Sequence, residues 1–277
     1  MIQNLLEKFR EIQNKTSWDA YEVSCHLFRN NNEILESCGT GIFLKILDDY
    51  FLITVAHVAE SLNFEFYVGL EKHTIFKLGG NLVTNKTNNR DKDKFDICVL
   101  KLCSETIENI SKTYNFLNLQ EIDINHDYKN LPLYELVGFP ATKSKYNKYK
   151  KKLYSKAYRY ITTPVLEKNI YKNLKCSTSY NVILNYDRKK VYNYKKKSTQ
   201  IGPELEGISG CGLWYTPVEE ITSKEKPKKY LVAIITEWPI NDRKYLIATK
   251  IDLFTEVIRQ HFKIDIPKSS ITFSITK

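Results

Sequence analysis

One short segment restricts the fold more than any other: Tyr50-Phe51-Leu52-Ile53-Thr54-Val55. Side chains of a strand point alternately to its two faces, and this segment carries large apolar side chains at both sets of positions. A strand that is apolar on both faces is typical of the centre of a barrel. It follows a turn at Asp48-Asp49 and leads directly to His57, so we expect a hairpin that holds this histidine at the rim of a sheet.

Short strand patterns recur along the whole chain of 277 residues. The chain is 42% hydrophobic and 13% aromatic, which is typical of a protein with a substantial core. Many short strands separated by turns predict an all-β fold of two packed barrels or sandwiches. We expect strands over residues 21–27, 39–46, 50–55, 64–70, 73–77, 96–102, 131–139, 154–165, 180–186, 212–215, 230–236 and 246–249.

Helical patterns are expected near both ends of the chain. Apolar residues between positions 2 and 13 have helical spacing, and Asp252 is expected to cap a closing helix that continues to Phe262. The predicted organisation has four parts: a helix and linker over 1–20, a first barrel over 21–125, a second barrel over 126–250, and a helix and tail over 251–277.

Charges within the first apolar stretch argue against a signal peptide, and no segment approaches the length of a transmembrane helix. Six cysteines occur without a CxxC pair or metal-ligand spacing to histidine, which is typical of small buried residues in a reducing compartment. We therefore expect a cytoplasmic protein with no membrane contact, no metal and no cofactor.

A second motif, Gly207-Ile208-Ser209-Gly210-Cys211-Gly212, carries candidate chemistry. Glycine two positions before a serine lets the backbone turn so that amide N–H groups converge beside the hydroxyl. Such amides stabilise the oxyanion that forms when a hydroxyl attacks a carbonyl. Because Gly-x-Ser-Gly also occurs in ordinary turns, the motif needs a base and a carboxylate elsewhere in the chain.

The candidate base is His57, since it ends a fully apolar strand. His26, His73, His126 and His261 lie in ordinary strand, polar or helical contexts. The candidate carboxylate is Asp96, which directly precedes the apolar Ile97-Cys98-Val99-Leu100 and would be unfavourable there without a partner. Asp91 and Asp93 lie among lysines and are expected to be solvated.

These residues occur in motifs that resemble the trypsin-like, chymotrypsin-fold serine peptidases. The matching segments are Gly39-Thr40-Gly41-Ile42-Phe43, Ile53-Thr54-Val55-Ala56-His57-Val58, Asp96-Ile97-Cys98-Val99-Leu100 and Gly207-Ile208-Ser209-Gly210. The order His, Asp, Ser is that of the family, and the extended Gly-x-Ser-Gly-x-Gly-Leu-Trp is most similar to intracellular bacterial members. The resemblance implies two packed antiparallel six-stranded β-barrels with the active site in the cleft between them.

The same resemblance implies the roles of individual residues. Ser209 is the nucleophile, His57 the general base and Asp96 its orienting carboxylate, acting on peptide bonds of a protein or peptide substrate through an acyl-enzyme. The backbone N–H groups of Gly207 and Ser209 form the oxyanion hole. Substrate backbone pairs with a segment that includes Thr236, Glu237 and Trp238. The resemblance also suggests bacterial regulatory or antiviral proteolysis, and, because no activating N-terminal cleavage is evident, a regulatory protein partner.

Three alternatives stay open from the sequence. Cys211 could replace Ser209 as nucleophile, although only Ser209 has the Gly-x-nucleophile-Gly pattern. The chain could be a catalytically silent scaffold or a basic nucleic-acid-binding module, since the net charge is +10 and lysines alternate with tyrosines over 143–159 and 188–197. We favour solvated hairpins for these segments and do not expect nucleic acid as a partner.

Glu204, Glu206 and Glu237 either favour a basic residue before the scissile bond or are only rim charges.

Overall fold

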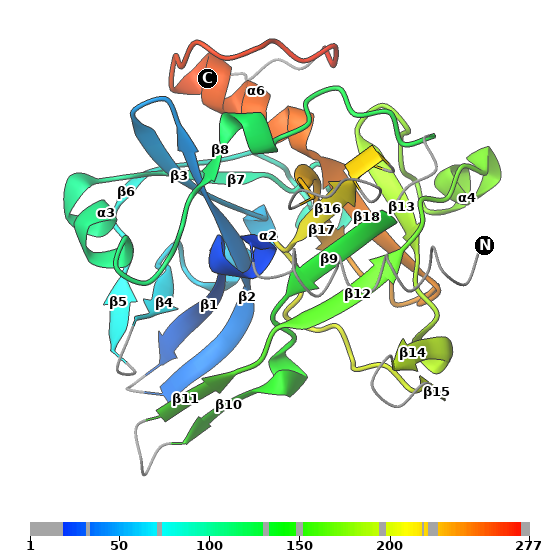
Figure 1. Cartoon of the computed structure of the whole chain (residues 1–277), viewed down its shortest axis with the longest axis horizontal. Coiled ribbons are helices and arrows are strands. Elements are labelled where there is room, and N and C mark those ends of the chain that lie inside the picture. Colours follow the sequence, from blue (N-terminus) through cyan, green and yellow to red (C-terminus); the bar gives the residue numbers. More distant parts are fainter. Residues whose placement is uncertain are drawn as a thin grey trace.

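The chain folds into two curled antiparallel β-sheets that lie side by side (Figure 1). The computed structural model describes residues 19–31, 34–70, 74–129, 133–147, 152–193, 198–217, 219–220 and 227–272. The first sheet uses the N-terminal half of the chain and the second uses most of the C-terminal half.

The first sheet has the strand order β5-β4-β1-β2-β3-β7-β6, and β8 pairs in parallel with β2. The apolar segment that leads to His57 is β3, and it lies between β2 and β7 in the middle of this sheet. β5 and β6 at the two ends of the order follow each other in the sequence, so the sheet curls on itself. Its strands are β1 Ser24–Asn31, β2 Ile34–Ile46, β3 Asp49–Thr54, β4 Tyr67–Gly69, β5 Ile75–Lys77, β6 Gly80–Thr84, β7 Cys98–Leu102 and β8 Leu117–Asn118.

The second sheet has six strands in the order β12-β9-β16-β17-β18-β13. Its two edges meet, because the N–H of Val165 donates to Ile183 O at 2.8 Å and the N–H of Asn185 donates to Thr163 O at 3.0 Å. These bonds join the extension of β12 to β13 and close the barrel. Its strands are β9 Leu133–Gly138, β12 Tyr158–Thr162, β13 Asn181–Asn185, β16 Gly212–Thr216, β17 Tyr230–Glu237 and β18 Tyr245–Lys250.

Two small hairpins and several short helices complete the described part of the chain. The hairpins are β10 Ser144–Asn147 with β11 Lys152–Ser155, and β14 Val191–Asn193 with β15 Ser198–Gln200. The helices are α2 Ala56–Ser61, α3 Ser104–Ile110, α4 Lys168–Asn173 and α6 Ile251–His261, with 3-10 turns η2 Arg90–Lys92, η3 Leu119–Glu121, η4 Ala141–Lys143 and η5 Arg188–Lys190.

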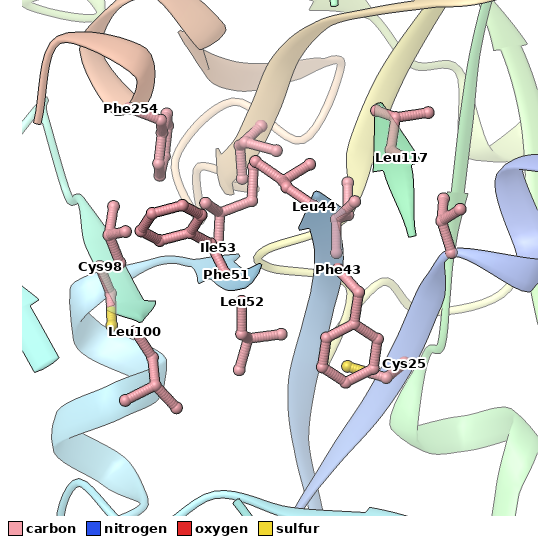
Figure 2. Packing of buried hydrophobic residues seen from close by; sticks show 14 of the residues in the cluster. Cys25, Phe43, Leu44, Phe51, Leu52, Ile53, Cys98, Leu100, Leu117 and Phe254 are labelled. Carbon is pink, nitrogen blue, oxygen red and sulfur yellow. The ribbon is translucent and has the colours of Figure 1, made fainter. Parts of the chain in front are cut away.

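The core of the first sheet is also the contact between the sheets. Phe43, Phe51 and Ile53 are fully buried at its centre (Figure 2). Trp214 of the second sheet belongs to the same continuous hydrophobic cluster. Helix α6 closes the cluster from the C-terminal end of the chain, and its Phe254 lies near Phe51 (Figure 2). Helix α6, which follows the second sheet in the sequence, therefore completes the core of the first sheet.

The predicted all-β, two-barrel fold is confirmed, and the first sheet has seven strands along its path instead of six. The extra strand arises because β4, β5 and β6 are separate short strands. The expected N-terminal helix lies almost wholly outside the described residues. The closing helix exists, but its N-cap is Lys250 and Asp252 lies in its first turn. In the described part of the chain, no helix has the length and apolar character needed to span a membrane.

Replacing Phe254 by alanine is expected to lower the free energy of unfolding by about 3–5 kcal/mol, because the side chain is fully buried and its loss leaves a cavity. Urea denaturation measures the change. Phe254→Leu, which keeps most of the apolar volume, should cost clearly less. Equal stability of the alanine variant and the wild type would show that α6 does not complete the core.

Candidate active site

Ser209 lies in a tight turn over residues 207–210 that precedes β16. The turn needs glycine at two positions, because φ is +84° at Gly207 and +87° at Gly210, a region that residues with a Cβ rarely occupy. A Cβ on Gly210 would also overlap the carbonyl oxygen of Thr40 in β2. The second sheet thus presents the serine directly against the backbone of the first.

His57 lies in the first turn of α2, at the end of β3, and is held at two points by Asp96. The ring Nδ1 lies 2.6 Å from Asp96 Oδ2, and the backbone N–H of His57 donates to Asp96 Oδ1 at 2.9 Å. The carboxylate is buried, whereas about 38% of the His57 side chain is exposed. A carboxylate on Nδ1 favours the tautomer that leaves Nε2 free to accept a proton.

Asp96 is fixed by a loop whose organising residue is Asp93. Asp96 has a left-handed backbone with φ of +50°, which aspartate tolerates better than most residues. The carboxylate of Asp93 accepts from the N–H of Phe95 at 2.9 Å and from the N–H of Asp96 at 3.1 Å. It also accepts from Arg90 at 2.5 Å and Asn85 at 2.7 Å. Only 4% of the Asp93 side chain is exposed, so the expectation that it is solvated was wrong.

Arg90 links this loop to the helix that carries the histidine. Its guanidinium contacts Glu60 of α2 at 2.6 Å as well as Asp93. Burial acts to lower the pKa of Arg90, but these two carboxylates hold it above its usual value. These ion pairs connect the loop to α2 and so keep Asp96 aligned with His57.

The same loop is anchored to the second sheet. Asn181 Nδ2 donates to Lys94 O at 2.7 Å, and Thr249 Oγ1 donates to Phe95 O at 2.9 Å. The Lys94 ammonium also pairs with Glu237 at 2.5 Å. Residues from β13, β17 and β18 thus determine where Asp96 lies, although Asp96 belongs to the first sheet.

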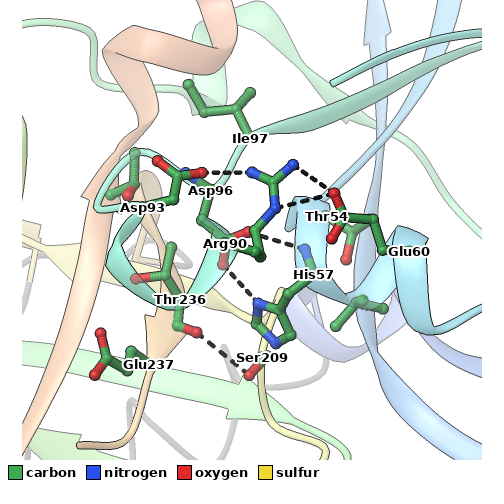
Figure 3. Close-up of polar contacts among 12 residues, drawn as sticks. Thr54, His57, Glu60, Arg90, Asp93, Asp96, Ile97, Ser209, Thr236 and Glu237 are labelled. Atoms are coloured by element: carbon green, nitrogen blue, oxygen red, sulfur yellow. Dashed lines mark hydrogen bonds and ion pairs between the residues drawn. The ribbon is translucent and has the colours of Figure 1, made fainter. Parts of the chain in front are cut away.

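Ser209 and His57 come from different sheets and lie close together (Figure 3). In that view the ring edge that carries Nε2 points toward the Ser209 hydroxyl. The hydrogen bond of Ser209 Oγ is directed to Thr236 O at 3.4 Å, and among the described residues none joins Oγ to the ring. Rotation about χ1 of the serine redirects the hydroxyl. Active-site hydrogen bonds of this kind are commonly long before substrate binds.

Two amide N–H groups beside the hydroxyl have no hydrogen-bond partner in the part of the chain that the structure describes. Neither Gly207 nor Ser209 donates its N–H to any described residue. The carbonyl of Glu206 accepts from the N–H of Ala141 at 2.8 Å. Because a trans peptide places C=O and N–H on opposite sides, the Gly207 N–H points away from Ala141. Both amides are therefore available to an oxyanion.

The segment expected to contact substrate, Thr236-Glu237-Trp238, lies at the end of β17, and its three residues make different contacts within the chain. Thr236 is the extra residue of a β-bulge against β18, and its carbonyl is the acceptor nearest to Ser209 Oγ. Bulges are frequent beside active sites, where they redirect backbone groups. Glu237 is held by Lys94, and the Trp238 indole N–H donates to Arg243 O at 3.1 Å.

The carboxylates considered for substrate specificity are mostly engaged within the chain. Glu204 forms ion pairs with Arg188 and Arg243. Glu237 pairs with Lys94. Glu206 is exposed, and no ion pair joins it to another described residue. A preference for a basic residue before the scissile bond would therefore depend on Glu206.

Cys211 is fully buried, and its Sγ lies in the core of the second sheet. Burial raises the pKa of its thiol well above the usual value, so the thiolate that nucleophilic attack requires is strongly disfavoured. Cys103 behaves oppositely: it is exposed, and a hydrogen bond from Thr106 lowers its pKa. The geometry thus favours Ser209 over Cys211 as the reacting residue.

His26 and His126 have structural environments, and His261 is exposed at the end of α6, with its ring against Phe262. Both ring nitrogens of His26 lie 2.6 Å from serine hydroxyls, those of Ser155 and Ser37, and burial lowers the pKa of the ring to about 3. His126 is buried between Asp123 and Tyr134. His73 lies outside the described residues. Within the described ranges, no group of three or more His, Cys, Asp or Glu side chains could hold a metal ion.

Two curled antiparallel sheets, with the candidate site where they meet, define the chymotrypsin-like fold. Among solved structures, that of GrC, a granzyme with this fold, is similar, with a TM-score of 0.53 over 87% of this chain and 93% of the GrC chain. The two sequences are 14% identical, so the similarity concerns the fold alone. No protein family model matches the chain, and no curated protein matches its sequence.

Replacing Asp93 by alanine is expected to destabilise the protein by about 3–5 kcal/mol, because it leaves two backbone N–H groups without their acceptor and removes one of the two carboxylates that neutralise the largely buried Arg90 guanidinium. Chemical denaturation measures the loss. Asp123→Ala is a suitable comparison, since Asp123 also has a partner within the chain, His126, but its side chain is about 38% exposed. A change at Asp93 no larger than that at Asp123 would contradict the proposed organisation of the loop.

Iodoacetamide is expected to alkylate Cys103 of the folded protein first and to leave Cys211 unmodified. The lowered pKa and exposure of Cys103 provide thiolate near neutral pH, whereas the buried thiol of Cys211 stays protonated. Peptide mapping by mass spectrometry after timed labelling distinguishes the six cysteines. Early modification of Cys211 in native protein would restore it as a candidate nucleophile.

Proposed function

We propose that this chain is a serine endopeptidase that hydrolyses peptide bonds of protein or peptide substrates. The single observation that carries the proposal is the coincidence, where the two sheets meet, of Ser209, the His57–Asp96 pair and the two unpartnered amides. The similarity to a serine protease fold supports the same class of reaction. No single one of these features would suffice, because each also occurs in proteins with other activities.

In the proposed mechanism, Ser209 Oγ attacks the carbonyl carbon of the scissile peptide while His57 Nε2 takes the hydroxyl proton. Asp96 keeps the ring in the required tautomer and stabilises the imidazolium. The N–H groups of Gly207 and Ser209 donate to the oxyanion of the tetrahedral intermediate. His57 then gives the proton to the leaving amine, and water hydrolyses the acyl-enzyme by the same route.

The biological setting is also part of the proposal. All six cysteines are free, which suits a reducing, cytoplasmic compartment. The resemblance of the sequence motifs to intracellular bacterial peptidases supports a role in regulatory or antiviral proteolysis with a dedicated protein substrate. A regulatory protein partner would control an enzyme of this kind.

A fluorophosphonate probe tests the proposal directly, because it forms a covalent bond with an activated serine. Wild type and Cys211→Ala are expected to label, and Ser209→Ala is expected not to label. Peptide hydrolysis by Ser209→Ala or His57→Ala should fall by about four to six orders of magnitude. Labelling that persists in Ser209→Ala, or wild type that neither labels nor cleaves a peptide library, would contradict the proposed activity.

A further inference from the structure

Thr40 lies in the segment Gly39-Thr40-Gly41 of β2, and the proposed triad makes no use of it. It is fully buried and occupies the point at which the first sheet touches the 207–210 turn. Its N–H donates to Ser209 O at 2.8 Å. A Cβ on Gly39 would lie 3.2 Å from Ser209 O and still closer to Val58, so this stretch of β2 approaches the turn closely.

The Thr40 hydroxyl bridges two segments of the second sheet. It accepts the N–H of Phe139, just after β9, at 3.0 Å, and its proton is directed to Gly207 O at 3.5 Å. A hydroxyl has one donor hydrogen and two acceptor lone pairs, so it can serve both groups at once. The Thr40 carbonyl in turn accepts from Thr54 Oγ1 at 2.7 Å. Every polar group of this residue is thus engaged at the contact between the sheets.

Four consecutive backbone carbonyl groups of the turn each accept a hydrogen bond. Glu206 O accepts from Ala141 N, Gly207 O from Thr40 Oγ1, Ile208 O from Cys211 N and Ser209 O from Thr40 N. Because each peptide is planar, fixing a carbonyl fixes the N–H of the next residue. The peptide between Gly207 and Ile208 lies between the two unpartnered amides, and it is the one that the Thr40 side chain contacts.

We propose that Thr40 is a positioning residue whose hydroxyl holds the 207–208 peptide, and with it the spacing of the Gly207 and Ser209 amides. The assignment of those amides to an oxyanion rests on the proposed function. The positioning itself is a statement about the turn, and it applies whether or not a substrate is cleaved. The first sheet would thereby supply an alignment device for the oxyanion donors as well as the base and its carboxylate.

Thr40→Val tests this role, because valine has nearly the same shape but cannot bond Phe139 N–H or Gly207 O. The Phe139 N–H would be left buried without a partner, Gly207 O would lose its donor, and the peptide would be free to reorient. Amides that stabilise only the transition state affect kcat and leave KM unchanged. We expect kcat to fall about 10- to 100-fold, less than the about 100- to 1000-fold typical when an oxyanion donor is removed outright.

Two comparison variants separate positioning from general destabilisation. Thr40→Ser keeps the hydroxyl and should restore kcat. Thr106→Val removes a matched buried hydroxyl, which accepts from Gly79 N at 2.8 Å and donates to Gly79 O at 3.2 Å in a part of the first sheet remote from the turn. It should lose a similar amount of stability and keep kcat. A peptide aldehyde, whose adduct with Ser209 carries an oxyanion, should bind more weakly to Thr40→Val by the same factor as kcat falls.

A measurement that does not depend on catalysis completes the test. Amide hydrogen exchange followed by NMR reports the Ile208 N–H, which donates to Leu205 O at 3.0 Å and belongs to the 207–208 peptide. Its exchange should accelerate in Thr40→Val and be normal in Thr40→Ser and Thr106→Val. Unchanged exchange would overturn the positioning role. If exchange accelerates but wild type neither labels nor hydrolyses, the positioning role stands and the peptidase proposal fails. Accelerated exchange with unchanged kcat would overturn the link to the oxyanion donors.

Discussion

The two sheets touch backbone to backbone where Thr40 of β2 meets the 207–210 turn, and the rest of the site depends on that contact. It is possible because Gly210 has no side chain: any Cβ there would overlap Thr40 O. Elsewhere the sheets are separated by side chains such as Trp214. At this contact no side-chain layer lies between the two backbones, so the position of Ser209 relative to β2 depends on the Thr40 N–H bond to Ser209 O together with the bonds of the Thr40 hydroxyl.

A second set of contacts between the sheets runs from side chains of the second sheet to the backbone of the first. Asn181 and Thr249 of the second sheet hold the backbone of the loop that ends at Asp96. Each sheet therefore supports the chemistry carried by the other. A serine on one sheet and a His–Asp pair on the other would lose their alignment with any relative rotation of the sheets, and these bonds oppose such rotation. Rigid support of this kind is what preorganised sites require.

Sequence patterns predicted well what depends on local periodicity. Apolar side chains on both faces predicted the central position of β3, and the glycine spacing predicted the turn around Ser209. The pairing of His57 with Asp96 could be predicted because a buried carboxylate needs a partner and the chain offers few histidines. The burial of Asp93 could not be predicted in this way, because its ion-pair partner is Arg90 and not one of the lysines beside it in sequence. The buried Glu135 is similar: its partners Arg159, in β12, and Lys229, just before β17, are distant from it in sequence. Thr40 was part of a recognisable motif, yet its hydrogen bonds join three segments that only the tertiary fold brings together.

Helix α6 has a consequence for how the protein is made. The residues that complete the core of the first sheet, Phe254 among them, follow the whole second sheet in the sequence. A ribosome releases the N-terminal half long before it has synthesised them, and domains generally fold as their residues emerge. The first sheet of a nascent chain would therefore have an unfilled core throughout the synthesis of the second. The support of His57 and Asp96 matures only after the second sheet has been synthesised, so assembly of the whole site is delayed until after Ser209 itself has been synthesised.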